Sequence, residues 1–214
     1  MKKTIIITGG SSGIGLELVR YFLKKNHIIH TNYMKSSKEL VKLKKKYDKH
    51  LFFKKMDIGN IKDITMFLKA IKKESKLIDV VILNALNKLK RKRFNKLKKK
   101  EFIESINKNL LGNLFFLEKL NKIFLLKKKI KFVHISSVVS KKGSWGLSHY
   151  APIKAAIDNL FKCLQFEYNN KIKFKSIYLS AVDTKGYRYT NGYKNLHKTI
   201  KTKEAILKII KSIN

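Results

Sequence analysis

Thr8-Gly9-Gly10-Ser11-Ser12-Gly13-Ile14-Gly15 is the stretch that decides the fold. It follows the apolar run Thr4 to Thr8 and leads into an amphipathic segment, which is the strand, turn and helix context of a phosphate-binding motif. In such a motif Gly9 permits the tight turn, Gly13 lets the backbone approach a pyrophosphate, and Gly15 lets the helix pack closely on the strand. The helix N-terminus then attracts the anion. The stretch predicts a dinucleotide site at Gly9, Ser11, Ser12, Gly13, Ile14 and Gly15.

The rest of the chain alternates short apolar runs with longer amphipathic segments, a pattern typical of a parallel sheet with helices on both faces. We predict an α/β fold, a Rossmann-type doubly wound sheet, in a single domain spanning residues 1–214. The predicted strands are Thr4 to Thr8, Ile28 to Tyr33, Leu51 to Met56, Ile78 to Leu83, Lys131 to Ile135 and Phe174 to Leu179. The predicted helices are Ile14 to Lys25, Ser37 to Tyr47, Ile61 to Glu74, Lys100 to Leu126, His149 to Tyr168 and Lys203 to Ile213.

The C-terminal region carries a weaker pattern. Residues Lys185 to Thr202 are polar, with tyrosines and glycines, and we predict a loop that covers the substrate. No apolar strand follows the last predicted helix, so we expect the sheet to be truncated at its C-terminal strand.

Composition limits the class of protein. The chain has 214 residues, of which 44% are hydrophobic, and no apolar run reaches the roughly 18 residues of a membrane span. The run Ile5 to Ile7 is too short for a signal peptide, so we expect the mature chain to begin here, in the cytoplasm. The single cysteine, Cys163, agrees with a reducing compartment and falls in a helical apolar pattern, which predicts a core position.

The charge is strongly basic, with a formal net charge of +36. Only four of the 50 basic residues are arginine, which leaves 46 lysines. Because phosphate and base recognition favours the arginine fork, we interpret the lysines as solvated surface and do not predict a nucleic-acid partner. The densest run, Lys88 to Lys100, has two interpretations: a solvated loop entering a helix, or a site for an anionic ligand, an acyl carrier protein or RNA.

A second constellation concerns proton transfer. Tyr150 and Lys154 are four residues apart, so on a helix they share a face. A neighbouring ammonium favours the phenolate, and we expect it to lower the pKa of Tyr150 toward a usable range. Ser137, after the fifth predicted strand, can hydrogen-bond a substrate oxygen, and Asn109 can anchor a water beside Lys154.

Three strand ends add cofactor contacts, because ligands of such folds lie beyond the carboxyl edge of the sheet. Asp57, with Ile58, follows the third strand, where its carboxylate either accepts from an adenine amino group or caps the next helix. Asn84-Ala85 follows the fourth strand, where the carboxamide can bridge neighbouring strand ends. The second strand ends in Tyr33-Met34-Lys35-Ser36 with no acid before Glu39, which favours NADP(H) over NAD(H), through Tyr33, Lys35 and Ser36.

In these motifs the chain resembles the classical short-chain dehydrogenases/reductases. The resemblance runs from about Thr4 to Thr184 and includes the glycine motif, Asp57, Asn84-Ala85, Asn109, Ser137 and Tyr150-x-x-x-Lys154. It implies hydride transfer between nicotinamide and a carbonyl or alcohol, with Tyr150 as acid and base, Ser137 orienting the oxygen, Lys154 assisting and Asn109 in a proton relay. It also implies a homodimer built through the fourth and fifth helices, which fits the apolar density at Leu110-Leu111, Leu114 to Leu117 and Leu120.

The chain departs from the family pattern at two places. The glycine that ends Asn-Asn-Ala-Gly is Leu86, and the Pro-Gly after the sixth strand is Leu179-Ser180. Val182 and Thr184 remain where the nicotinamide carboxamide is usually met, so we include both in the cofactor site.

Two functional hypotheses follow. The first is a carbonyl reductase that uses NADP(H) on a small or acyl-linked carbonyl substrate. The second is a non-catalytic nucleotide-binding regulator or basic interaction protein of the same fold, suggested by Leu86, by Leu179-Ser180 and by the basic run. We predict no metal site, because the six histidines lack the paired spacing of zinc ligands.

Overall fold

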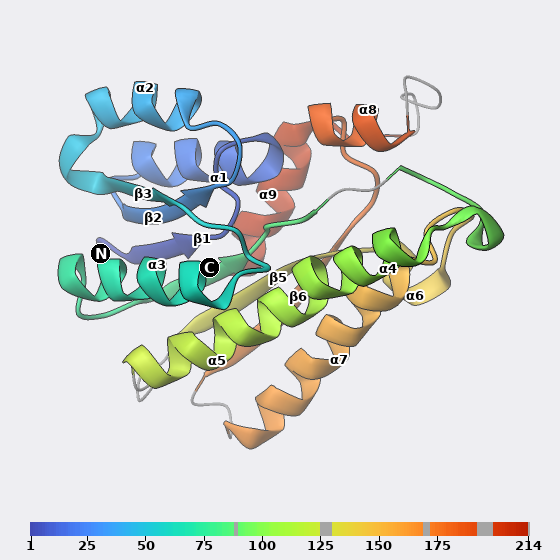
Figure 1. The fold of residues 1–214 in the computed structure, drawn as a ribbon. Coiled ribbons are helices and arrows are strands. Elements are labelled where there is room, and N and C mark those ends of the chain that lie inside the picture. Colours follow the sequence, from blue (N-terminus) through green and yellow to red (C-terminus); the bar gives the residue numbers. More distant parts are fainter. Residues whose placement is uncertain (88–89, 125–129, 169–171, 192–198, 214) are drawn as a thin grey trace.

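The computed structural model describes residues 1–87, 90–124, 130–168, 172–191 and 199–213. Six strands form one parallel sheet in the order β3-β2-β1-β4-β5-β6 (Figure 1). Their bounds are β1 Thr4–Ile7, β2 Ile28–Tyr33, β3 Leu51–Lys55, β4 Val80–Leu83, β5 Lys131–Ser137 and β6 Lys173–Leu179. The chain builds outward from β1 in one direction and then crosses to β4, so the predicted doubly wound Rossmann-type fold is confirmed. Within the described ranges the sheet has no strand beyond β6.

The central strands are apolar throughout because helices cover both of their faces. Ile5 of β1 lies in register with Ile29 of β2 and with Val80 of β4, and all three side chains are buried. All strands run the same way, so their carboxyl ends meet at one edge of the sheet, which collects the polar residues described below.

Helices of two groups cover the sheet (Figure 1). The helices are α1 Gly13–Lys24, α2 Lys38–Lys46, α3 Ile61–Glu74, α4 Lys99–Ser105, α5 Gly112–Phe124, α6 Val139–Lys142, α7 Ala151–Glu167, α8 Lys185–Asn191 and α9 Thr202–Ile213. One core joins α1, α2 and α9 to the sheet through side chains such as Val19, Leu40 and Ile209. The other core lies beneath α3, α5 and α7, around Leu68, Phe116, Leu120, Ile157 and Phe161.

The predicted helix from Lys100 to Leu126 is interrupted. α4 is followed by the π-helical segment Ile106–Leu111 and then by α5, while Leu125 and Leu126 lie outside the described residues. The π-helical segment turns Asn109 into the interior, where 2% of its surface is exposed. A polar residue in an amphipathic pattern gives no sign of such a bulge, so the sequence predicted one continuous helix.

Two further expectations were wrong. Part of the predicted loop from Lys185 to Thr202 is helical, because the Thr184 hydroxyl accepts from the amide of Tyr187 at 3.1 Å and starts α8; residues 192–198 lie outside the described part. Cys163 is exposed rather than in the core, because the apolar face of α7 passes through Ile157 and Phe161 instead.

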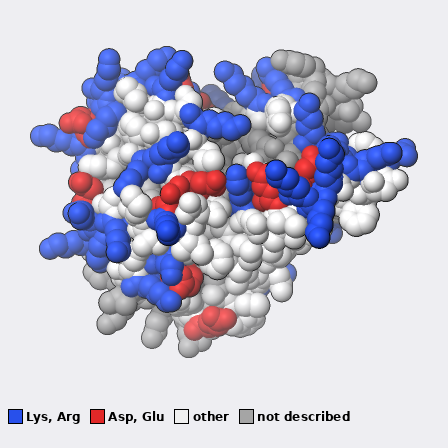
Figure 2. Space-filling view, viewed as in Figure 1, with Lys and Arg blue, Asp and Glu red and all other residues white. Residues whose placement is uncertain are grey.

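Figure 2 shows lysine and arginine side chains over much of this face, with acidic side chains among them. Several lysines pair with acids one helical turn away, such as Lys208 with Glu204 at 3.1 Å and Lys44 with Asp48 at 2.9 Å. Within the described ranges, no helix combines the length and the apolar character that crossing a bilayer requires.

Candidate active site

The glycine turn between β1 and α1 has the geometry that a bound phosphate needs. Gly9 and Gly13 both have positive φ, 71° and 54°, which favours glycine. A Cβ on Gly15 would lie 2.3 Å from the carbonyl oxygen of Gly9, so only glycine fits there. Ser12 precedes α1 in an extended conformation without a side-chain cap, and the first amides of the helix have no earlier helical carbonyl to bind. The start of α1 therefore presents backbone donors at the edge of the sheet, whereas the amides of Gly9 and Gly10 bind Asn32.

Asn84, at the end of β4, ties this turn in place. The side-chain nitrogen Nδ2 of Asn84 donates to the carbonyl oxygens of Thr8 and Gly9 at 3.0 and 3.1 Å. The Thr8 hydroxyl in turn accepts from the backbone amides of Asn84 and Ala85, both at 3.0 Å. The bridge between strand ends expected of Asn84 is thus present, and Ala85 approaches Gly9 closely enough that a Cβ on Gly9 would lie 2.9 Å from its Cα.

A second bridge was not predicted. The Asn32 side-chain oxygen accepts from the amide of Gly9 at 2.8 Å, and its nitrogen donates to the carbonyl oxygen of Met56 at 3.1 Å. Asn32 is 3% exposed and joins the ends of β1, β2 and β3. A buried asparagine inside a predicted strand was the available signal.

Asp57 does not cap α3. Its carboxylate accepts from the amide of Gly59 at 2.9 Å and lies 3.4 Å from the ammonium of Lys108, whereas Asn60 caps the helix. Ile58 is buried in the core, so its side chain contributes packing. The Asp57 carboxylate stays 25% exposed at the sheet edge, where the adenine contact was predicted.

The end of β2 is cationic and polar. Lys35 and Ser36 are exposed, and Tyr33 is half-buried with its ring edge toward Phe53. The next acid, Glu39, lies on α2, where its carboxylate binds Arg20 at 2.6 Å. That carboxylate is therefore engaged away from the strand end.

Val182 and Thr184 follow β6 at the same edge. Val182 is buried and pairs with Ile200 through an isolated parallel bridge, which joins the segment before α9 to the segment after β6. Thr184 lies near the glycine turn, since a Cβ on Gly13 would be 3.8 Å from its methyl group. The structure thus brings the predicted cofactor residues from both halves of the sheet together.

Tyr150, Ser137 and Lys154 meet where β5 ends and α7 begins. Tyr150 occupies the N-cap position of α7, and the side chain of Ser137 lies close enough to its phenol to affect the pKa of that group. The Lys154 ammonium lies 5.9 Å from the centroid of the Tyr150 ring and is 6% exposed. Residues from one strand and one helix therefore converge on a single point, as predicted.

The expected lowering of the Tyr150 pKa is wrong for this structure. Burial raises the pKa of Tyr150 to about 12, the hydrogen bond with Ser137 opposes the rise, and the negative charge of Asp158 adds to it. Lys154 is itself buried, and burial lowers its pKa to about 8. Tyr150 is therefore a neutral phenol at physiological pH.

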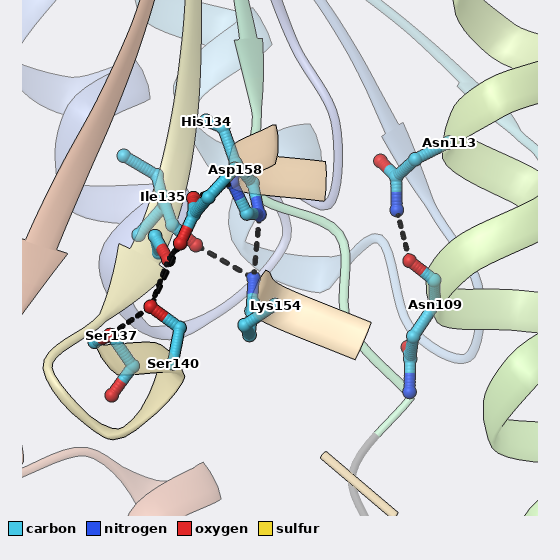
Figure 3. Close-up of polar contacts among 9 residues, drawn as sticks. Asn109, Asn113, His134, Ile135, Ser137, Ser140, Lys154 and Asp158 are labelled. Carbon is cyan, nitrogen blue, oxygen red and sulfur yellow. Dashed lines mark hydrogen bonds and ion pairs between the residues drawn. The ribbon is translucent and has the colours of Figure 1, made fainter. Parts of the chain in front are cut away.

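Figure 3 shows no hydrogen bond between the side chains of Asn109 and Lys154. Its side-chain oxygen accepts from the amide of Asn87 at 2.7 Å, and its nitrogen donates to the Asn87 carbonyl at 2.9 Å. Its own carbonyl accepts from Asn113 at 2.8 Å. Asn109 holds the strand-end loop that carries Asn84 to Asn87.

Sequence comparison decides the family. The sequence model of the family "short chain dehydrogenase" matches residues 3–193. The chain belongs to the short-chain dehydrogenase family.

Individual members of the family are distant relatives of this short-chain dehydrogenase. It is 27% identical over 187 residues to an NADP-dependent 3-hydroxy acid dehydrogenase of Schizosaccharomyces pombe, an alignment that covers 85% of this chain and 72% of the relative. It is 24% identical over 190 residues to a benzil reductase ((S)-benzoin forming) of Bacillus cereus, covering 84% and 76%. Among solved structures, ElxO with NADP bound superposes with a TM-score of 0.87 at 24% identity, covering 100% of this chain and 92% of ElxO.

The basic run of this short-chain dehydrogenase is partly structural. Arg91 donates to the Ser144 hydroxyl at 3.1 Å and to the carbonyl oxygen of Trp145, and Lys92 binds the Glu101 carboxylate. The Arg91 contacts fasten the run to the loop that precedes Tyr150, and the Lys92 contact fastens it to α4. Lys88 and Leu89 lie outside the described residues. In the part of the chain that the structure describes, no group of three or more His, Cys, Asp or Glu side chains is placed to hold a metal ion.

Proposed function

We propose that this protein is an NADP(H)-dependent carbonyl reductase in which Tyr150 is the general acid and base. The observation that carries the proposal is the convergence of Tyr150, Lys154 and Ser137 at the sheet edge that also holds the glycine turn, with the Lys154 ammonium 5.9 Å from the centroid of the Tyr150 ring. Membership of an oxidoreductase family agrees with it. The presence of all four predicted side chains favours catalysis over the non-catalytic alternative.

The residues at the sheet edge fit a dinucleotide. The glycine turn from Gly9 to Gly15 would hold the pyrophosphate on backbone donors, and Asp57 would meet the adenine. Val182 and Thr184 would lie beside the nicotinamide end. When bound, the cofactor supplies the hydride that the protein side chains lack.

The protein's own side chains manage the proton. Ser137 would orient the substrate oxygen, and Tyr150 would donate its phenolic proton to that oxygen as negative charge develops on it. Because burial raises the pKa of Tyr150 to about 12, the phenol carries its proton across the physiological range, which suits reduction of a carbonyl. Lys154, charged below its pKa of about 8, would stabilise the phenolate that is left.

The cofactor preference rests on the end of β2. A 2′-phosphate needs cations and hydroxyls, which Lys35 and Ser36 offer from exposed positions. A ribose diol needs a carboxylate, and Glu39 is bound to Arg20 instead. The names of the Schizosaccharomyces pombe relative and of the ElxO structure include NADP, which supports the same preference.

The substrate class is a small or acyl-linked ketone or aldehyde. The relatives named for a hydroxy acid and for benzil both support a carbonyl or alcohol substrate. We further propose a cytoplasmic homodimer formed through α5 and α7, which lie side by side on one face of the sheet (Figure 1). Phe116 and Leu120 belong to the core of the protomer, so the interface would use neighbours such as Phe115.

The test is a titration of the protein with NADPH and NADH by nicotinamide fluorescence, followed by a panel of carbonyl compounds. We expect tighter binding of NADPH and oxidation that depends on substrate. Tyr150→Phe should bind NADPH within a factor of about three of wild type and lose at least about 100-fold in kcat. Retained turnover in that variant would refute the role of Tyr150, and binding without any turnover by wild type would support the regulator instead.

A further inference from the structure

A buried polar network surrounds the Lys154 ammonium and includes two residues that no motif singled out, His134 and Asp158 (Figure 3). The Lys154 ammonium donates to the carbonyl oxygen of Ile135 at 2.6 Å and lies 3.1 Å from Nε2 of His134. His134 is on β5, directly beneath α7, and is 1% exposed. The catalytic lysine therefore has a side-chain partner in the core as well as a backbone partner.

The second ring nitrogen of His134 leads to a carboxylate. Nδ1 lies 2.9 Å from Oδ1 of Asp158, which is 6% exposed. The other carboxylate oxygen accepts from the hydroxyls of Ser136 at 2.7 Å and Ser140 at 2.8 Å. A carboxylate held by several donors stays ionised, and these bonds outweigh burial and lower the pKa of Asp158 to about 2.

The chemistry of the donors fixes the tautomer of His134. An ionised carboxylate can only accept, so Nδ1 carries the proton and donates to Asp158. Nε2 is then bare and accepts from the Lys154 ammonium. Burial and the nearby Lys154 charge lower the pKa of His134 to about 4, so the ring is neutral at physiological pH, as this arrangement requires.

The negative charge of Asp158 compensates the positive charge of the buried Lys154 ammonium. This negative charge raises the pKa of Lys154 against the larger effect of burial. The other elements packed on α7 also carry titratable groups. Tyr178 on β6 has a raised pKa, and the Lys141 ammonium of α6 lies 3.9 Å from the centroid of its ring. Lys108 on the π-helical segment binds Asp57 and Glu104. Asp158 is thus the carboxylate that supports the buried ammonium.

We propose that His134 and Asp158 are positioning residues for the reaction: His134 fixes the Lys154 ammonium beside Tyr150, and Asp158 supplies the charge that keeps it protonated. The proposal rests on the proposed reductase function. Tyr150, Lys154 and Asp158 recur every four residues and share one face of α7, and His134 on β5 connects the last two.

Asp158→Asn tests the charge, since it keeps the shape of the side chain. Without the carboxylate, the Lys154 ammonium loses its proton at lower pH, so the alkaline limb of the kcat profile should move down by roughly one pH unit or more. At pH 8 we expect kcat to fall by about 10-fold or more, while KM and the NADPH dissociation constant change by less than about 3-fold. The matched control is Ser140→Ala, which removes one donor to the same carboxylate and should leave the limb in place.

His134→Gln and His134→Leu test the contact. The glutamine oxygen can accept from the Lys154 ammonium and leucine cannot, so the glutamine variant should recover most of the kcat that the leucine variant loses. Urea unfolding of each variant at the assay pH gives the folded fraction. If the leucine variant does not fold, the pH profile of Asp158→Asn decides the question alone.

The outcomes separate the two proposals. An alkaline limb that moves in Asp158→Asn but not in Ser140→Ala supports the positioning role. If the alkaline limb of the kcat profile moves in neither variant, and kcat falls only in proportion to the folded fraction, the positioning role is overturned. The proposed reductase function would then remain intact. If no carbonyl compound of the panel supports NADPH oxidation by the wild-type protein, the proposed function itself is overturned, and the positioning role with it.

Discussion

The side chain of Asn109 closes on the main chain of Asn87, with its oxygen 2.7 Å from the amide and its nitrogen 2.9 Å from the carbonyl oxygen. The Asn109 side chain thus pairs with both the amide and the carbonyl of Asn87, as a neighbouring β-strand residue would. It fixes the loop after β4, which carries Asn84 and Ala85 to the glycine turn. A residue predicted for a proton relay therefore also builds the loop beside the cofactor site.

Replacing this side chain should destabilise the protein. Asn109→Ala leaves the amide and carbonyl of Asn87 without their partner, which should lower the free energy of unfolding by about 2–4 kcal/mol. Urea denaturation would measure it. Asn107→Ala is the matched control, because Asn107 lies exposed on the same π-helical segment and should change stability by less than about 0.5 kcal/mol. Equal effects of both variants would contradict the role of Asn109.

Gly15→Ala should disrupt the glycine turn by steric overlap. Its Cβ would lie 2.3 Å from the Gly9 carbonyl oxygen and 2.5 Å from the Asn84 amide nitrogen, so the turn must shift. We expect the affinity for NADPH, followed by fluorescence, to fall by at least about 10-fold, because the backbone donors at the helix N-terminus move.

Gly143→Ala controls for substitution of a glycine as such. Gly143 has a φ of 66° and a ψ of −179° with open space around it, so alanine there meets no neighbour and costs only backbone strain, about 1–3 kcal/mol. Its affinity for NADPH should match that of wild type. Normal binding by Gly15→Ala would show that the turn does not hold the cofactor.

The fold and the four catalytic candidates were predictable because they depend on local patterns. A strand, a glycine turn and a helix occupy adjacent positions in the chain, and Tyr150 and Lys154 are one helical turn apart. Contacts between distant segments were not predictable. Asn32 and His134 are polar residues inside apolar strand patterns, but the sequence does not indicate which residues, 23 or 24 positions away, they bind.

The pKa of Tyr150 shows the same limit. The sequence indicates that a lysine lies near the phenol, but it does not indicate how deeply both groups are buried. Burial raises the pKa of Tyr150 and lowers that of Lys154, and it dominates both values. Asp158, four residues after Lys154, was available as a signal on the same helix face.

Stability should fall in mild acid because of a buried histidine. His30 stacks on Phe52 and hydrogen-bonds Ser75 at 2.9 Å, and burial lowers its pKa from 6.5 to about 4. Between these values the unfolded chain binds a proton that the folded protein excludes, so the free energy of unfolding falls as pH falls from 6.5 to 4. The loss from His30 should approach about 3 kcal/mol.

His30→Gln removes this titration, so its urea stability should vary less than that of wild type across the same pH range. His134, whose pKa is also about 4, should keep part of the acid dependence in the variant. His50→Gln serves as the control, because His50 lies at the end of a short surface turn and is only partly buried. Parallel pH profiles for wild type and His30→Gln would contradict the assignment.

Cofactor preference should respond to one charge at the end of β2. Lys35→Glu places a carboxylate where a 2′-phosphate is proposed to bind, so NADPH affinity should fall by about 10-fold or more while NADH affinity is retained or rises. Lys38→Glu makes the same change of charge at an exposed position three residues on and should alter the ratio by less than about 3-fold. Equal shifts in both variants would indicate a general effect of net charge.

The proposed dimer can be tested on α5. Phe115 is 37% exposed on this helix, next to Phe116 in the core, and an aromatic side chain so placed gains from burial against a second copy. We expect wild type to sediment as a dimer and Phe115→Glu as a monomer, with urea stability measured at low protein concentration unchanged within about 1 kcal/mol. Phe94→Glu is the control, since Phe94 is 74% exposed on the basic loop away from α5, and it should remain dimeric. A wild-type monomer at micromolar concentration would refute the proposed assembly, and dissociation by both variants would place the interface elsewhere.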